Sequence, residues 1–251
     1  MSKNTRRTGA VAAFLGAAAL IAPAFANAAP TGSLGSADPE TGFTCSVTST
    51  ETTANGWGIP FADEKDQTAS YSAESVFDTD GSLKLEVTDV SDRSVSYHSA
   101  GGIALSDAAT KEIGFSERTE TTSASFQLRL TGTTNPADGG FTTLVWVPSQ
   151  NGAPATTAAV EHTNIQDGLW KSTRTIGGAS KGVLTSLDTI IAANPGAKVE
   201  HYGVSKGTGT SASTIFVDAV KFNGCTTNFA KKDADPETGT GSLGNLFGSL
   251  S

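Results

Sequence analysis

The sequence predicts an all-β protein, a jelly-roll-type antiparallel β-sandwich with one short helix and disordered tails. Through the middle of the chain, apolar residues alternate with polar ones, which is the pattern of strands with one buried and one wet face. Clusters of Asn, Asp, Gly and Pro separate these stretches and are typical of turns. The composition is rich in Ser, Thr and Gly, and only 17% of the residues are charged, which favours a β-rich extracellular protein.

Five stretches are expected to form strands. In the first, Leu83, Leu85 and Val87 alternate with Lys84 and Glu86, so one face of the strand is apolar. The other four stretches are residues 124–131, 141–147, 199–204 and 214–222. Many strands separated by turns are typical of sandwiches of the jelly-roll type.

One short helix is expected between the third and fourth of these regions of the chain. Leu187, Ile190 and Ile191 form an apolar stripe at helical spacing. Ser186 or the residue before it can cap the start, and the Asn-Pro-Gly sequence at 194–196 ends the helix.

The first 28 residues have the pattern of a secretory signal peptide. A basic start is followed by an apolar run at 9–25 and by a small-residue A-x-A site at 26–28. A membrane anchor is the alternative, but Pro23 interrupts the run and the A-x-A site follows at once. No later stretch approaches the ~20 apolar residues that span a bilayer. We therefore expect a secreted or cell-surface protein with no transmembrane segment after signal removal.

Two tails are expected to flank a single domain. Residues 29–42 form an N-terminal linker, residues 43–229 the β-sandwich domain, and residues 230–251 a C-terminal tail. The tails are poor in core residues and contain the same short segments. The sequence at 37–42 recurs at 234–239, and that at 31–35 recurs at 240–244. This composition is typical of low-complexity linkers.

The two cysteines, Cys45 and Cys225, lie near the two ends of the expected domain. In an exported chain they are expected to form a disulfide, which would hold the first strand beside the last. Free thiols or a metal site are the alternatives, and both are disfavoured in an oxidising compartment without a nearby histidine ligand.

The charge of the chain argues against two classes of partner. The formal net charge is −8, and loss of the signal segment removes three basic residues and no acid, which gives −11. Nucleic-acid backbones and anionic membrane surfaces both require clusters of Lys and Arg. No nucleic-acid partner is therefore expected.

The motifs of known enzymes are weak in this chain. The sequence at 203–207 matches G-x-S-x-G, but no helix is expected after it, so we interpret it as a hairpin loop. The three histidines are widely spaced and favour scattered surface positions. The close acid pairs, Asp78 with Asp80 and Glu117 with Glu120, are expected in a turn and in an exposed polar stretch, respectively.

Aromatic side chains offer a second kind of candidate site. Trp170, Tyr202 and His201, with Tyr97 beside them, are expected to form a platform on one face of the sandwich. Such rings can stack on sugars, and the alternative is that they pack in the core.

Three segments, 135–148, 187–209 and 215–224, carry a family resemblance. They look like secreted jelly-roll modules of actinobacteria, and the last strand resembles that of carbohydrate-binding modules of the galactose-binding-like families. The resemblance covers most of residues 43–229. It implies a structural calcium ion held by Asp218 and Glu51, with Gly56 and Trp57 following the latter. The sequence departs from the family at Ala219: only the single Asp218 precedes it, whereas these modules often carry a second Asp.

Three functional hypotheses follow. The leading one is a non-enzymatic protein that binds a glycan or another extracellular polymer at or near the cell envelope. The second is a structural or interaction protein of the cell surface with no small-ligand cleft. The third, an extracellular hydrolase on a jelly-roll fold, is disfavoured because no convincing acid pair or triad stands out. Whether the protein is an enzyme is left open.

Overall fold

The computed structural model describes residues 37–38, 42–61, 69–153, 155–209 and 212–232. All described residues belong to one compact unit. The expected signal peptide at 1–28 lies outside the described residues. So do most of the expected linker at 29–42 and most of the expected tail at 230–251.

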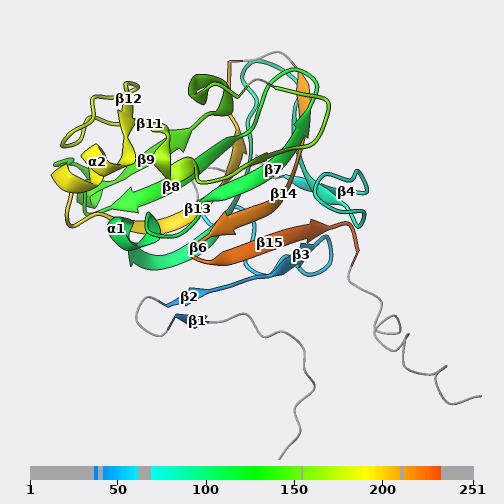
Figure 1. The fold of residues 1–251 in the computed structure, drawn as a ribbon, viewed down its shortest axis with the longest axis horizontal. Coiled ribbons are helices and arrows are strands. Elements are labelled where there is room, and N and C mark those ends of the chain that lie inside the picture. Colours follow the sequence, from blue (N-terminus) through cyan, green and yellow to red (C-terminus); the bar gives the residue numbers. More distant parts are fainter. Residues whose placement is uncertain (1–36, 39–41, 62–68, 154, 210–211, 233–251) are drawn as a thin grey trace, which may run out of the picture. The chain divides into compact units, whose positions relative to one another are not determined.

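The predicted fold class is confirmed: the domain is an all-β sandwich of two sheets (Figure 1). One sheet has six strands in the order β12-β11-β9-β8-β13-β6. The other has seven, in which β10-β7-β14-β15-β3 form a path and β5 and β4 extend from β14. β1 pairs with β2 in a separate ribbon. Among the described residues, the strands pair antiparallel except for β15 with β3, and one isolated parallel bridge joins Ser172 to Lys181.

The strands have the following bounds. They are β1 (Ala37–Asp38), β2 (Phe43–Thr44), β3 (Thr48–Thr50), β4 (Ser70–Ser72), β5 (Ser82–Val87), β6 (Ser94–Ala104), β7 (Gly114–Thr119), β8 (Ser125–Thr131), β9 (Thr142–Trp146), β10 (Val160–His162), β11 (Leu169–Ser172), β12 (Leu184–Ser186), β13 (Lys198–Lys206), β14 (Ser213–Phe222) and β15 (Cys225–Ala230). All five expected strands are among them, as β5, β8, β9, β13 and β14.

Two short α-helices connect strands. The expected one is α2 (Leu187–Ala193), in which the Ser186 side chain accepts the backbone N–H of Thr189 and caps the start. The other, α1 (Leu105–Ala108), has only four residues and follows directly from β6. Within the described residues, no helix is long and apolar enough to span a membrane.

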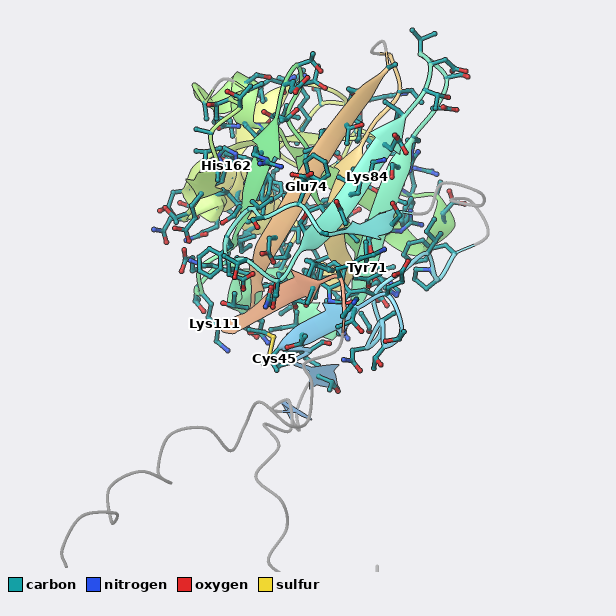
Figure 2. All side chains as sticks on the ribbon, turned by 90° about the vertical axis from the view of Figure 1, so that its right-hand side faces the viewer. Cys45, Tyr71, Glu74, Lys84, Lys111 and His162 are labelled. Carbon is teal, nitrogen blue, oxygen red and sulfur yellow. A yellow bond between two sulfur atoms is a disulfide. The ribbon has the colours of Figure 1, made fainter. Side chains whose placement is uncertain are left out.

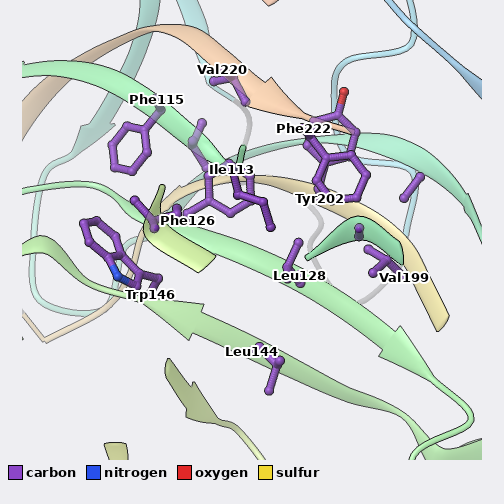
Figure 3. Packing of buried hydrophobic residues seen from close by; sticks show 14 of the residues in the cluster. Ile113, Phe115, Phe126, Leu128, Leu144, Trp146, Val199, Tyr202, Val220 and Phe222 are labelled. Carbon is purple, nitrogen blue, oxygen red and sulfur yellow. The ribbon is translucent and has the colours of Figure 1, made fainter. Parts of the chain in front are cut away.

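The core lies between the two sheets and is rich in aromatic rings (Figure 3). Tyr202 of β13 stacks on Phe222 of β14, with ring centroids 4.2 Å apart. Phe126 of β8 meets Phe115 of β7 at 6.2 Å. Both contacts join one sheet to the other, so burial of these rings holds the sandwich together.

Cys45 and Cys225 form the predicted disulfide, with Cα atoms 5.5 Å apart (Figure 2). The bond lies where β3 runs beside β15, so the early strand is held next to the last one as expected. Because it closes a loop of 180 residues, its contribution in the chain-entropy model is about 5 kcal/mol.

Candidate functional site

The expected aromatic platform is not on the surface. Trp170, Tyr202 and Tyr97 each expose 0% of their surface. The Trp170 indole packs against Phe126 and donates its Nε1–H to the carbonyl oxygen of Ile165 at 3.1 Å. Rings that are fully covered cannot stack on a sugar, so the core interpretation holds for Trp170 and Tyr202, whereas Tyr97 is covered outside the core cluster.

His201 and Tyr97 nevertheless mark a surface, the outer face of the six-stranded sheet. In the register of β13, Tyr202 and Val204 point into the core, so their neighbour Gly203 faces outward. Tyr97 lies opposite Gly203, and its hydroxyl donates a hydrogen bond to Oε1 of Gln127. His201 is half-buried and meets the ring of Phe61 edge-on at 4.5 Å.

Two adjoining hollows of about 260 and 540 Å³ lie on this outer face. They share five lining residues, which makes them one continuous depression across β8, β9 and β13. We call it the outer groove. The shared residues are Gln127, Val145, Ser205, Gly207 and Thr208. The remaining lining residues are Arg93, Thr121, Thr122, Ser123, Ser125, Arg129, Phe141, Thr143, Val147, Ser149, Gln150, Ala155, Thr173 and Lys206.

The lining of the outer groove is dominated by hydroxyl and amide groups. Among the described residues that line it, none is Asp or Glu. The floor contains Ser205, whose hydroxyl oxygen is buried and has no hydrogen-bond partner among the described residues. Buried polar groups normally have a partner, so this hydroxyl is an exception within the floor of the groove.

A stack of aromatic rings and guanidinium groups forms one end of the outer groove. The Arg129 guanidinium lies 3.9 Å from the ring centroid of Phe61 and 4.7 Å from that of Phe141. Arg174 also lies over Phe141, at 5.5 Å, and pairs with Asp138 at 2.6 Å. Cation–π contacts of this kind hold the rings and the charged groups in place.

Close strand packing also shapes the outer face. A Cβ atom at Gly203 would lie 2.1 Å from the carbonyl oxygen of Ser96 on β6. Only glycine therefore allows β13 to approach β6 at this point. The G-x-S-x-G sequence has this structural role: most of it belongs to β13, so the expectation of a hairpin loop was wrong.

Another hollow, of about 800 Å³, lies over β5, β7 and β14 on the seven-stranded sheet. Four of its charged groups form ion pairs: Arg118 with Glu74 at 2.5 Å and Lys84 with Glu86 at 2.8 Å. Figure 2 labels Glu74 and Lys84 on this side of the molecule. A ligand here would compete with existing ion pairs, whereas the outer groove presents mostly neutral groups.

Two of the three histidines are buried, which corrects the expectation of scattered surface positions. His98 and His162 are each 5% exposed. Nε2 of His162 lies 3.0 Å from Oε1 of Glu117, and Oε2 of Glu117 accepts the backbone N–H of Ala124. Glu117 is fully buried rather than exposed as expected, and the pair fastens β7 to β10 inside the protein.

Burial also lowers the pKa of two histidines. The pKa of His98 lies below its ordinary value because burial disfavours the charged ring, although hydrogen bonds with backbone atoms of Ser99 and Asn55 partly offset this. The pKa of His201 is lowered first by burial and then by the positive charge of Arg129. The charged form of each imidazole is therefore disfavoured in the folded protein.

The two residues that the resemblance assigned to calcium lie in different environments. Asp218 of β14 is fully buried. Glu51 is half-exposed, and its Oε2 pairs with Nζ of Lys231 at 2.8 Å. Among the described residues, no group of three or more Asp, Glu, His or Cys side chains is placed to hold a metal ion.

The residues of the outer groove were only partly foreseeable from the sequence. The alternation in 124–131 already placed Gln127 and Arg129 on the wet face of a strand. Phe141 and Ser205 gave no such signal, because their place in the groove depends on how β9 and β13 lie beside β8.

No protein-family model matches this chain, and no curated protein sequence is significantly similar to it. A solved structure of a family 30 carbohydrate binding module is similar with a TM-score of 0.41 and 14% sequence identity. The match covers 75% of this chain and 85% of that chain.

Proposed function

We propose that this protein binds an extracellular glycan in the outer groove, at or near the cell envelope. The observation that carries the proposal is the continuous groove across β8, β9 and β13, which is lined by many hydroxyl and amide groups and by three basic side chains, Arg93, Arg129 and Lys206. Sugar hydroxyls both donate and accept hydrogen bonds, so Ser, Thr and Gln side chains are suitable partners. A groove that crosses three strands suits a polymer better than a small molecule.

Two further features support a role outside the cell. The disulfide between Cys45 and Cys225 suits an oxidising compartment, where such bonds form and persist. The signal pattern at 1–28 is the second feature.

A blocking substitution tests the groove. Val145 is half-buried and lines both hollows, so Val145→Trp places a large ring in the groove without changing the core. Affinity electrophoresis through gels that contain soluble polysaccharides of different classes measures retention. We expect the wild type to be retarded by at least one class and Val145→Trp to lose most of that retardation.

The matched control is Val47→Trp, because Val47 is 40% exposed and precedes β3 on the other sheet. This variant should be retarded like the wild type. Equal retardation of Val145→Trp and wild type contradicts binding in the outer groove.

A surface-interaction role without a cleft is the second candidate, and one feature favours it. Leu169, Val183 and Leu184 are 41%, 54% and 37% exposed at the β12 edge of the six-stranded sheet. Exposed apolar groups beside an edge strand can contact another protein. If no polysaccharide retards the wild type, Leu184→Lys should reduce retention of the protein on cell envelopes, and unchanged retention contradicts this role.

A further inference from the structure

The charged side chains in the described lining of the outer groove are all basic. Arg93 and Arg129 line the smaller hollow, and Lys206 lines the larger one. The chain as a whole is acidic, with 25 Asp and Glu residues against 17 Lys and Arg. The groove therefore departs from the overall charge of the protein, and a local excess of positive charge attracts anions.

The hollow on the seven-stranded sheet has the opposite balance of charge. Its described lining contains three acids, Glu74, Glu86 and Glu120, and two bases, Lys84 and Arg118. Both bases form ion pairs with acids of the same lining. Of these two surfaces, only the outer groove has an excess of positive charge in its described lining.

Lys206 is the most deeply buried of the three bases in the outer groove. It is the last residue of β13 and is only 4% exposed. Its Nζ donates a hydrogen bond to the carbonyl oxygen of the neighbouring Gly207 at 3.2 Å, and no described acid forms an ion pair with it. Burial lowers the pKa of the Lys206 ammonium group, because the charged form loses contact with water. An anion bound beside Lys206 would offset that loss.

Two buried hydroxyl groups line the same hollow as Lys206. The hydroxyl oxygens of Ser123 and Ser205 have no hydrogen-bond partner among the described residues. Ser205 precedes Lys206 on β13, and Ser123 lies just before β8, the strand that pairs with β13. Hydroxyl groups donate hydrogen bonds, and such bonds are stronger when the acceptor oxygen is charged. The larger hollow thus combines one buried cation with two groups suited to donate to an anion.

We propose that the outer groove binds an acidic polysaccharide, whose carboxylate or sulfate groups contact Lys206, Arg93 and Arg129. This inference rests on the proposed function, because it names the class of glycan that the same groove binds. Arginine presents a planar fork of donors that matches an anionic group, and lysine supplies a compact charge. The neutral Ser, Thr and Gln side chains of the lining then contact the sugar hydroxyls.

Matched pairs of polysaccharides, immobilised on beads and incubated with the full chain, separate the effect of charge from that of sugar structure. One pair is polygalacturonate and its methyl ester, in which the carboxylates are neutralised. The other pair is dextran sulfate and dextran. We expect the protein to bind the acidic member of at least one pair about tenfold or more tightly than its neutral partner. The pair that shows this difference identifies the anionic group as carboxylate or sulfate.

Two negative results have different meanings. If the protein binds only neutral polysaccharides, or binds both members of each pair equally, the acidic class is wrong and glycan binding in the groove is not. If the protein binds no polysaccharide of either kind, the proposed function fails, and this inference fails with it.

Substitutions locate the positive charge. Lys206→Met keeps the buried apolar stem and removes the ammonium group, so it should weaken binding of the acidic polysaccharide about tenfold or more. Arg93→Gln should weaken it as well, and it keeps the test valid if the Lys206 variant fails to fold. Lys84→Met, in the hollow on the other sheet, is the matched control and should bind like the wild type. Wild-type binding by both Lys206→Met and Arg93→Gln overturns the proposal, as does an equal loss in Lys84→Met.

The hydroxyl group of Ser205 provides a separate readout. Because this group has no partner among the described residues, Ser205→Ala should leave the melting temperature unchanged or raise it. The same substitution should weaken binding of the acidic polysaccharide about two- to tenfold. Unchanged binding by Ser205→Ala contradicts an anion in the hollow beside Lys206.

Discussion

Replacing Trp170 by alanine removes the largest fully buried side chain of the sandwich. The change deletes the edge-on contact with Phe126 at 6.3 Å and the hydrogen bond from Nε1 to the Ile165 carbonyl. Truncation of a buried Trp costs about 3–5 kcal/mol of the free energy of unfolding. For a domain of this size, the melting temperature should fall by about 6–20 °C.

Urea unfolding followed by tryptophan fluorescence and by far-UV circular dichroism measures this loss. Trp170→Phe is the control, because it keeps an aromatic ring and loses the indole N–H, and it should cost only ~1–2 kcal/mol. If Trp170→Ala unfolds within ~1 kcal/mol of the wild type, the side chain is not a core residue. The reasoning that moved it from a binding platform into the core would then be refuted.

Three other substitutions test separate parts of the structure. Replacing Cys45 and Cys225 together by serine should lower the free energy of unfolding by about 5 kcal/mol in urea titrations, and an unchanged midpoint contradicts this. Gly203→Ala should lower the free energy of unfolding by at least ~1–3 kcal/mol, because the added Cβ would clash with the Ser96 carbonyl oxygen. Gly207→Ala is the control and should leave the free energy of unfolding nearly unchanged, because open space surrounds Gly207. Equal losses in the two variants contradict the strand-packing argument. Since burial lowers the pKa of His98, the unfolded chain binds more protons below about pH 6.5, so stability should fall as the pH drops from 7 to 5. His98→Gln should reduce that fall, and an identical pH dependence in the variant would show that His98 does not cause it.

The sequence predicted the sandwich because its strands carry a strict alternation. In β8 the apolar residues recur at every second position, which predicts that Phe126, Leu128 and Leu130 all face the core. All three are fully buried. The disulfide was equally predictable, since two cysteines have only one possible intramolecular pairing. α2 followed from its apolar stripe and its serine cap.

The burial of the aromatic rings was not predictable, because alternation does not show what covers a face. Tyr97 points outward from β6, yet it is fully buried, and its ring lies 5.2 Å from that of Phe61, which is distant in the sequence. Trp170 is enclosed because β11 lies between β9 and β12, an order that the sequence does not show. Contacts of this kind depend on the arrangement of the sheets and not on local pattern.

The surroundings of Asp218 could not be predicted from the sequence, for a related reason. The register between β14 and β7 shifts between Asp218 and Lys221, and Ala219 has a φ of 48° in this bulge. The irregularity brings the Phe229 N–H to the Asp218 carboxylate. A bulge that brings a side chain to the backbone of another strand leaves no clear mark in the sequence.

Mapping a bound polysaccharide fragment by NMR tests the central claim most directly. Isotope-labelled protein is titrated with a soluble fragment of whichever polysaccharide retards it, and the amide shifts are followed. We predict that the largest changes cluster on Gln127, Val145 and Ser205, which line both hollows of the outer groove, and on Thr143, which lines the smaller one. Changes centred on Glu74, Lys84 and Phe216, which line the hollow on the opposite sheet, would contradict the account.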